Sequence, residues 1–178
     1  MIRLKTLLFE LADTEIKRCL DKIKNNDFQL LGAGDNGRVY EINGEDKVFK
    51  ITKERDEYQV AKRIVNRYSD FTTFIPVYYV NGTDMYIMAN AEQLSSSIRR
   101  EIDSFMKDFA VYARQEGGEV SIFDFMQQTD SVNSQLDNFL TALETDIKKL
   151  NIPEFELDLD FRSDNVMQWN GKLVMVDW

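Results

Sequence analysis

Side chains that can move protons and bind cations gather near the end of the sequence, between positions 158 and 177. Four residues separate Asp160 from Asn165, and Asp177 follows after a short β-type segment. Phosphoryl transfer needs a carboxylate that accepts the proton of the attacking hydroxyl, and amide and carboxylate oxygens that hold Mg²⁺ on the phosphates. We therefore predict Asp160 as the base, Asn165 and Asp177 as Mg²⁺ ligands, and Arg162 as the cation near the γ-phosphate.

A glycine-rich segment, GAGDNG at 32–37, contains three of the eight glycines. Residues 38–42 (RVYEI) favour a strand, so this loop joins two antiparallel strands and does not open a helix as a dinucleotide-binding loop does. Small residues in such a loop let backbone N–H groups lie over phosphates. A flexible hairpin turn is the alternative that the segment, taken alone, leaves open.

Lys50 lies one strand after this loop, in the run KVFKI at 47–51. Val48 and Lys50 share one face of the strand, so the ammonium is expected to project beneath the glycine loop and reach the α- and β-phosphates. A carboxylate should hold that lysine. Glu57 shares a helical face with the apolar residues that follow it and is the favoured partner, whereas Glu54 is a possible substitute. Either glutamate could instead belong to a surface ion pair.

The elements that must position these residues show two kinds of pattern in the first half of the chain. Apolar residues recur about every 3.6 positions between 2 and 25, which predicts one or two amphipathic helices, the second capped at Asp13 or Thr14. Short runs of β-branched and aromatic residues then predict a five-stranded antiparallel sheet, interrupted by one helix at about 54–68. These runs are 28–32, 38–42, 47–51, 75–80 and 84–89, with Asn-Gly hairpin signals at 43–44 and 81–82.

The second half returns to helical spacing. Apolar stripes at 98–112 and 136–150 predict two helices, with a short helix near 121–128 between them. Two β-type runs flank Asn170-Gly171 and predict a final small hairpin. The whole pattern indicates an α+β fold. It is divided into an N-terminal helical extension (1–27), a nucleotide-binding lobe (28–90) and a reduced helical lobe (91–178).

The composition excludes several classes of chemistry. The 178 residues include no histidine and one cysteine, which rules out Ser-His-Asp and Cys-His nucleophile systems, imidazole metal sites and an internal disulfide. The formal charge is −9, and the excess of acid lies in the C-terminal half, which disfavours nucleic acid. A solvated acidic surface that aids solubility is the favoured interpretation, and an acidic face that recruits a basic partner or substrate is the alternative. The sequence shows neither a signal peptide nor a membrane span, so we expect a cytoplasmic protein.

Taken together, these motifs resemble those of the protein kinase-like superfamily. The match runs through GAGDNGRVY (32–40), VFKI (48–51), the helix of Glu57, DFRSDNVM (160–167) and VDW (176–178), in the family's order. Its compact spacing is most similar to that of the small early kinases of T7-type bacteriophages, which would place the protein in the host cytoplasm. The resemblance implies a two-lobe fold that uses ATP and Mg²⁺ and transfers the γ-phosphate to a hydroxyl, most often of Ser or Thr. It implies catalytic roles for Asp160, Lys50, Arg162 and Glu57, and ATP contacts at Gly32, Ala33, Gly34, Gly37, Val39, Lys50, Ala89 and Ala91.

The sequence also departs from the family pattern. Asp158 stands where the catalytic loop of the family has histidine, and Trp178 follows Asp177 where the family has Phe-Gly. The sequence contains no activation segment, so we expect residues 94–150, the N-terminal helices or a partner to provide the substrate platform, unless the chain is a truncated kinase domain. A Ser/Thr protein kinase is the favoured interpretation. A kinase-shaped protein that binds and inhibits a host enzyme, and a small-molecule kinase, are the alternatives.

Overall fold

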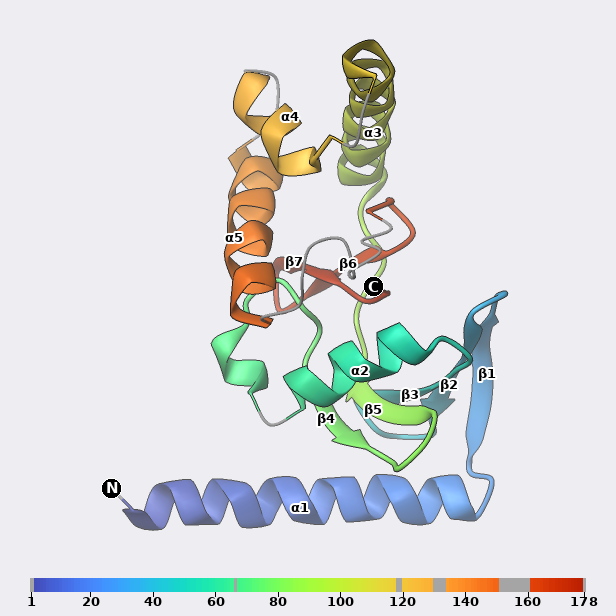
Figure 1. Ribbon diagram of the computed structural model, residues 1–178. Coiled ribbons are helices and arrows are strands. Elements are labelled where there is room, and N and C mark those ends of the chain that lie inside the picture. The colour runs from blue at the N-terminus through green and yellow to red at the C-terminus, as the bar shows by residue number, and fades with distance from the viewer. Residues whose placement is uncertain (1, 66, 118–119, 130–133, 151–160, 178) are drawn as a thin grey trace. The chain divides into compact units, whose positions relative to one another are not determined.

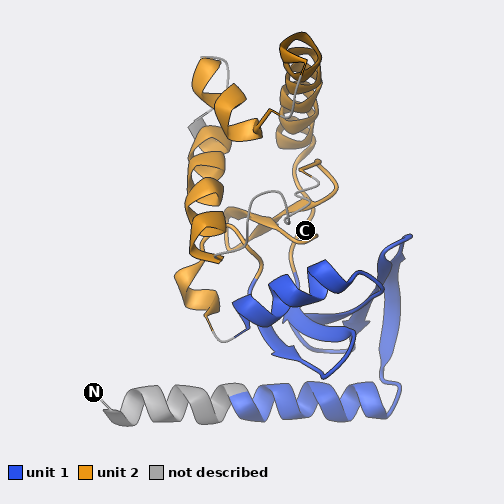
Figure 2. Cartoon of the chain, viewed as in Figure 1, with its two compact units in different colours: residues 1–66, 76–90 blue, residues 67–75, 91–178 orange. Residues whose placement is uncertain are grey.

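The computed structural model describes residues 2–65, 67–117, 120–129, 134–150 and 161–177, with side chains from residue 13 onward (Figure 1). The chain divides into two compact units (Figure 2). Unit 1 comprises residues 1–66 and 76–90, and unit 2 comprises residues 67–75 and 91–178. The proposed domain boundaries after residues 27 and 90 stay a prediction.

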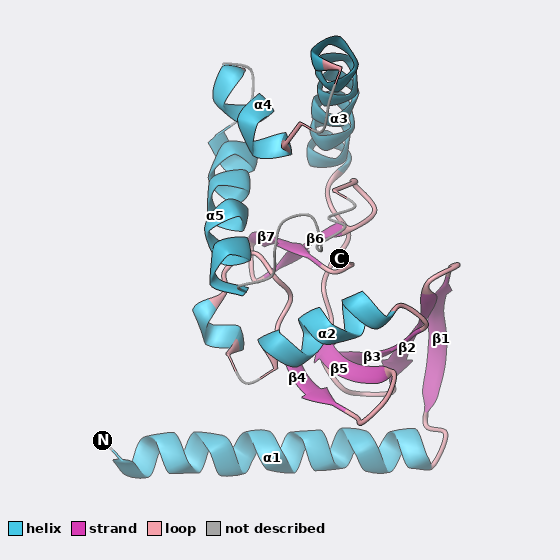
Figure 3. Ribbon diagram, viewed as in Figure 1, coloured by secondary structure: helices cyan, strands magenta, loops and turns pink. Residues whose placement is uncertain are grey.

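Unit 1 is built on a five-stranded antiparallel sheet in the order β1-β2-β3-β5-β4 (Figure 3). One helix, α2 (Arg55–Ile64), lies between β3 and β4 in the chain, so the predicted α+β class and the sheet with its single inserted helix are confirmed. The helix is shorter than the predicted 54–68 because its last inward-facing residue is Ile64. The strands are β1 (Phe28–Ala33), β2 (Gly37–Ile42), β3 (Lys47–Thr52), β4 (Val77–Val80) and β5 (Met85–Ala89).

The two faces of this sheet are covered by different helices. The strand register aligns Tyr40, Phe49 and Ile87 on one face, where the aromatic rings of Tyr40 and Phe49 stack 4.7 Å apart. The C-terminal part of α1 (Ile2–Lys24) packs onto this face and buries Cys19 completely. The opposite face carries Lys50 and contacts α2, which lies on the other side of the sheet from α1 in Figure 1.

A single helix spans the region where the sequence allowed two. The α1 sequence has no glycine or proline to end it at the suggested Asp13 or Thr14 cap, so it continues to Lys24. Polar contacts also hold it to the turn between β2 and β3: Arg18 Nη2 and Lys22 Nζ lie 2.6 and 2.8 Å from the Glu45 carboxylate. Hydrogen bonds from Arg18 and Lys22 lower the pKa of Glu45 from 4.5 to about 2. The N-terminal helix is therefore part of unit 1.

The three Asn-Gly dipeptides that the sequence analysis assigned to hairpins form turns of two kinds. Gly44 has φ +70°, and Asn170 and Gly171 have φ 49° and 75°, the left-handed conformations expected of tight hairpins. The Asn81-Gly82 turn works differently. The Oδ1 atom of Asn81 accepts hydrogen bonds from the backbone N–H groups of residues 83, 84 and 85, so the asparagine side chain organises this turn.

Unit 2 contains the predicted helices and the final hairpin. The helices are α3 (Ser96–Glu116), α4 (Ile122–Gln128) and α5 (Ser134–Leu150), preceded by the short 3-10 helix η1 (Tyr68–Asp70), and the hairpin strands are β6 (Val166–Trp169) and β7 (Lys172–Met175). The predicted apolar stripe of α5 is buried along its whole length, whereas α3 buries Ile102 and Phe105. None of the helices in the described parts of the chain is long and apolar enough to cross a membrane.

Candidate active site

A buried ion pair lies on the α2 face of the sheet in unit 1. The ammonium of Lys50 lies 2.5 Å from Oε1 of Glu57, and the two side chains are 6% and 2% exposed. The sequence favoured Glu57 over Glu54 because Glu57 shares a helical face with apolar residues, and those residues, Val60, Ala61 and Ile64, are buried. Glu57 also lies in the first turn of α2, where a negative charge is stabilised by the helix dipole.

Two buried hydroxyl groups complete the surroundings of Glu57. The hydroxyl of Thr52 donates to Oε2 of Glu57 over 2.5 Å, and the hydroxyl of Tyr86 donates to Oε1. The register pairs Lys50 with Tyr86 on neighbouring strands, which places both side chains on the same face. Sequence reasoning missed Thr52 and Tyr86. The two-residue period of β3 could have placed Thr52 beside Lys50, but Tyr86 depends on the register between β3 and β5.

The glycine loop joins β1 to β2, as predicted, and its glycines differ in their surroundings. The N–H of Gly34 donates to the carbonyl of Gly37 over 2.9 Å and closes the loop. A Cβ atom added at Gly32 or Gly34 would meet no other heavy atom within 4 Å, whereas one added at Gly37 would lie 2.3 Å from the Ile51 carbonyl oxygen. Gly37 is therefore required for the close approach of β2 to β3. The positions of Gly32 and Gly34 have space for a Cβ atom.

The other predicted ATP contacts are distributed between the two units. Ala33 ends β1, and Val39 pairs with Lys50 in the register of β2 and β3, on the face that carries the ion pair. Ala89 ends β5 in unit 1, and its N–H donates to the carbonyl of Pro76. Ala91 belongs to unit 2. The ATP-binding roles of these residues stay predictions.

In unit 2 the final hairpin brings the two predicted Mg²⁺ ligands to one end. The N–H of Val176 donates to the carbonyl of Asn165 over 3.0 Å, which continues the β6–β7 pairing by one residue. Asn165 and Asp177 consequently lie at the open end of the hairpin, opposite its Asn170-Gly171 turn. Asn165 is buried, and Asp177 is half-buried.

The loop that leads into this hairpin is anchored in the core of unit 2. The ring of Phe161 lies 6.4 Å from the ring of Phe105 on α3 and 6.2 Å from that of Phe139 on α5. The carbonyl of Arg162 accepts a hydrogen bond from the N–H of Asn165, which forms a turn, and the Arg162 side chain is exposed. Asp160, the predicted base, and Asp158 lie outside the described residues.

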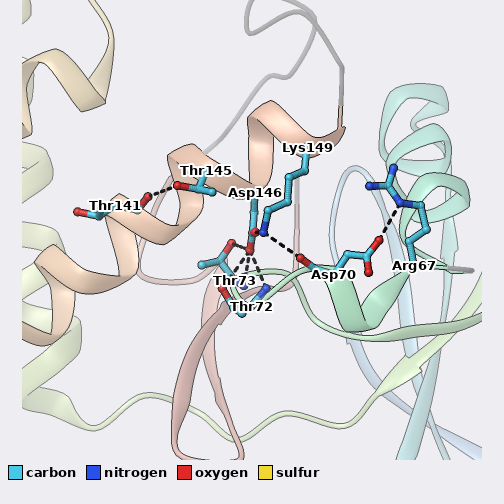
Figure 4. Close-up of polar contacts among 8 residues, drawn as sticks. All are labelled: Arg67, Asp70, Thr72, Thr73, Thr141, Thr145, Asp146 and Lys149. Carbon is cyan, nitrogen blue, oxygen red and sulfur yellow. Dashed lines mark hydrogen bonds and ion pairs between the residues drawn. The ribbon is translucent and has the colours of Figure 1, made fainter.

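A buried carboxylate that the sequence analysis did not single out holds this hairpin to α5. Oδ2 of Asp146 accepts hydrogen bonds from the backbone N–H groups of Thr72 and Thr73 over 2.6 and 3.0 Å, and from both threonine hydroxyls (Figure 4). Lys149 Nζ lies 2.8 Å from Oδ1. Burial raises the pKa of Asp146, but the hydrogen bonds from Lys149 and the threonines outweigh it, and the pKa is lowered overall.

The segment that contains Thr72 and Thr73 is in turn hydrogen-bonded to β7. The N–H of Met175 donates to the carbonyl of Thr73, and the N–H of Ile75 donates to the carbonyl of Met175. Segment 73–75 therefore extends the hairpin at β7, two residues from Asp177. Asp146 thus helps to fix β7, which ends two residues before the predicted Mg²⁺ ligand Asp177.

Unit 2 also contains a cavity of about 310 Å³ between α5, the Thr72–Thr73 segment and the turn of the hairpin. Phe139 and Leu173 contribute apolar surface, and Asn138 and Lys172 contribute polar groups. The four-residue strands β6 and β7 separate this turn from the open end by about 13 Å. The cavity extends from this turn to Thr73, whose carbonyl accepts a hydrogen bond from the N–H of Met175, two residues before Asp177.

The described residues offer suitable donors for ATP and Mg²⁺. Lys50 provides a cation for phosphate oxygens, and no other heavy atom lies within 4 Å of a Cβ position at Gly32 or Gly34. Asn165 and Asp177 supply amide and carboxylate oxygens, the ligands that Mg²⁺ prefers. Among the described residues no group of three or more His, Cys, Asp or Glu side chains could hold a metal ion.

The layout of unit 1 matches the nucleotide-binding lobe of protein kinase-like folds, which places a glycine-rich loop, a lysine on β3 and its glutamate partner on the next helix in this order. One solved structure to which the chain is similar is the "streptomycin-ATP-APH(2")-IIa ternary complex", with 22% sequence identity. The alignment covers 91% of this chain and 68% of that chain, with a TM-score of 0.37. A likeness of this size carries no functional inference. No protein-family model and no curated protein matches the chain.

Proposed function

We propose that this protein is an ATP- and Mg²⁺-dependent phosphotransferase that transfers the γ-phosphate of ATP to a hydroxyl group. The observation that carries the proposal is the buried ion pair between Lys50 on β3 and Glu57 on α2, which follow the glycine-rich loop and β2 in the chain. A buried ion pair loses much of its attraction to desolvation, and apolar residues would usually stabilise a core as well or better. A functional role therefore explains the buried, paired lysine at this position better than a contribution to the stability of the fold does.

Each predicted residue has a distinct part in the proposed reaction. Lys50 binds the α- and β-phosphates, Glu57 orients the lysine ammonium, and backbone N–H groups of the glycine loop bind phosphate oxygens. Asn165 and Asp177 bind Mg²⁺. When bound, Mg²⁺ neutralises negative charge on the phosphates and ATP supplies the phosphoryl group.

The phosphoryl step follows from these roles. Asp160 accepts the proton of the acceptor hydroxyl as its oxygen bonds to the γ-phosphorus. The bond from the γ-phosphorus to the bridging oxygen breaks, and ADP leaves with that electron pair. Arg162 stabilises the charge of the transferred group.

We favour a serine or threonine of a protein as the acceptor. Unit 2 carries nine basic and 18 acidic residues, whereas unit 1 carries 13 of each, so the acidic charge is concentrated in the unit that holds the predicted base. Such a unit attracts basic polypeptides.

The decisive experiment incubates the purified chain with Mg²⁺ and γ-labelled ATP, with and without a cell extract. We expect label on the protein itself or on a protein band, and the Asp160→Asn variant should lose transfer while it still binds Mg²⁺-ATP in calorimetry. Undiminished transfer by this variant would contradict the role of Asp160. Label on a small molecule would identify a small-molecule kinase, and binding without transfer by the unmodified protein would support the kinase-shaped binding protein.

A further inference from the structure

We propose that Thr52 and Tyr86 are positioning residues that hold Glu57 in its ion pair with Lys50. Side chains of unit 1 alone would then keep this ion pair formed. This inference rests on the proposed function for its catalytic consequence. Its structural part concerns only contacts within unit 1.

Both carboxylate oxygens of Glu57 have hydrogen-bond donors from the sheet. Oε1 contacts the Lys50 ammonium and the Tyr86 hydroxyl, and Oε2 accepts from the Thr52 hydroxyl. All four residues are at most 4% exposed. Water cannot readily replace a donor that is lost at this depth, so the position of the carboxylate depends on these partners.

Thr52 connects the carboxylate to the start of α2. Its Oγ1 accepts a hydrogen bond from the N–H of Glu54 over 3.0 Å, while its hydrogen points to Glu57, the nearest of its acceptors. Glu54 is the N-cap residue of α2, and its own side chain makes no capping hydrogen bond. Thr52 therefore performs a capping role from the preceding strand and fixes the first turn of α2, which contains Glu57, against β3.

Tyr86 holds the same carboxylate from the neighbouring strand. It is completely buried and pairs in register with Lys50. Its ring alone would serve the core, as a phenylalanine does, but its hydroxyl requires a hydrogen-bond partner when buried. Glu57 provides that partner. Among the described residues no buried side-chain nitrogen or oxygen lacks a hydrogen bond, so this network is complete.

This arrangement opposes any movement of Glu57 away from Lys50. Withdrawal of the carboxylate would remove an acceptor from two buried hydroxyls and the counter-charge from a buried ammonium. In protein kinases the Lys–Glu pair must be in place for activity, and the position of the helix that carries the glutamate controls it. Here, strands β3 and β5 hold that helix through hydroxyl groups, so the pair should be formed in the nucleotide-free protein.

The test compares Tyr86→Phe, which removes one hydroxyl, with Tyr40→Phe as the matched control. Tyr40 lies on the opposite face of the sheet, stacked on Phe49. In the full chain without nucleotide, we expect Tyr86→Phe to speed hydrogen exchange of the α2 backbone by about tenfold, the scale of a hydrogen bond to a charged group. Binding of Mg²⁺-ATP in calorimetry should weaken about threefold to tenfold, and Tyr40→Phe should change neither measurement.

Two further variants separate positioning from general stability. Thr52→Val should reproduce the effects of Tyr86→Phe. Thr52→Ser, which keeps the hydroxyl, should behave like the unmodified protein in both measurements. In a Glu57→Gln background Tyr86→Phe should weaken Mg²⁺-ATP binding much less than in the unmodified protein, because its effect passes through the carboxylate.

Unchanged α2 exchange and unchanged nucleotide binding in Tyr86→Phe would overturn the inference, as would equal effects with and without Glu57. The failure of the proposed function is distinguishable from both outcomes. It would appear as absent transfer by the unmodified protein, with the exchange difference between Tyr86→Phe and Tyr40→Phe intact.

Discussion

Replacement of Asp146 by alanine tests how the hairpin of unit 2 is held. Oδ2 of Asp146 accepts from two backbone N–H groups and two hydroxyls of Thr72 and Thr73, and Oδ1 pairs with Lys149 (Figure 4). The threonine hydroxyls can rotate towards other acceptors, but the two N–H groups are fixed by the backbone. Asp146→Ala therefore leaves two N–H donors without their acceptor, that of the buried Thr73 and that of the exposed Thr72.

The magnitude follows from these contacts. A buried donor without a partner costs about 1–3 kcal/mol, and this cost applies to the N–H of Thr73, whereas Lys149 and Thr72 are exposed and can bind water. With the smaller loss of the contacts to Lys149 and Thr72, we expect Asp146→Ala to lower the free energy of unfolding by about 2–4 kcal/mol. Asp146→Asn can keep an oxygen towards the threonines but turns its amide group to Lys149, so we expect a smaller loss of about 1–2 kcal/mol. Added Lys149→Gln should recover part of the loss in the asparagine variant, because it removes the contact between two donors.

Urea unfolding at pH 7, followed by tryptophan fluorescence, measures these differences. Trp169 on β6 reports on the hairpin. Thr145→Ala, an exposed substitution one residue away, is the control and should change the free energy of unfolding by less than about 0.5 kcal/mol. A loss below about 1 kcal/mol for Asp146→Ala would refute the view that Asp146 holds the hairpin to α5.

Two other predictions concern unit 1. The pKa of Glu45 is held at about 2 by Arg18 and Lys22, so the stabilisation is present above the ordinary pKa of 4.5 and is lost as the pH falls towards 2. Because Arg18 is solvent-exposed, we expect the free energy of unfolding to fall by only about 1–2 kcal/mol from this cause as the pH is lowered. Glu45→Gln should remove this pH-dependent contribution. An acid-unfolding profile identical to that of the unmodified protein would contradict the assignment. Gly37→Ala should lower the melting temperature by forcing β2 away from β3. Gly34→Ala should leave the melting temperature unchanged and weaken Mg²⁺-ATP binding. Calorimetry of both variants measures melting and binding, and the opposite pattern would contradict these assignments.

Sequence periodicity predicted the ion pair because both residues follow simple rules. Lys50 shares one face of β3 with Val48, and Glu57 shares a helical face with apolar residues, so each could be assigned a direction without knowledge of the fold. Thr52 follows the same two-residue period as Lys50 and could have been included. Tyr86 could not, because the register between β3 and β5 depends on the pairing of strands separated by α2 and β4 in the chain.

The role of Asp146 escaped sequence analysis for a different reason. Patterns of apolar residues located the buried face of α5 correctly, but they give no role to an acidic residue within that face. The partners of Asp146 lie 73 and 74 residues earlier in the chain, in a segment without regular helix or strand. No local pattern links these positions.

The glycine loop shows why one motif can combine two physical requirements. Gly37 has no space for a Cβ atom because β3 lies against it, so its lack of a side chain serves the sheet. Gly32 and Gly34 have space on that side, and nothing in the fold of unit 1 demands a small residue there. Neither the two glycines nor the buried Lys50 is needed for the stability of the fold. The proposed binding of phosphate would account for the glycines and for the lysine together.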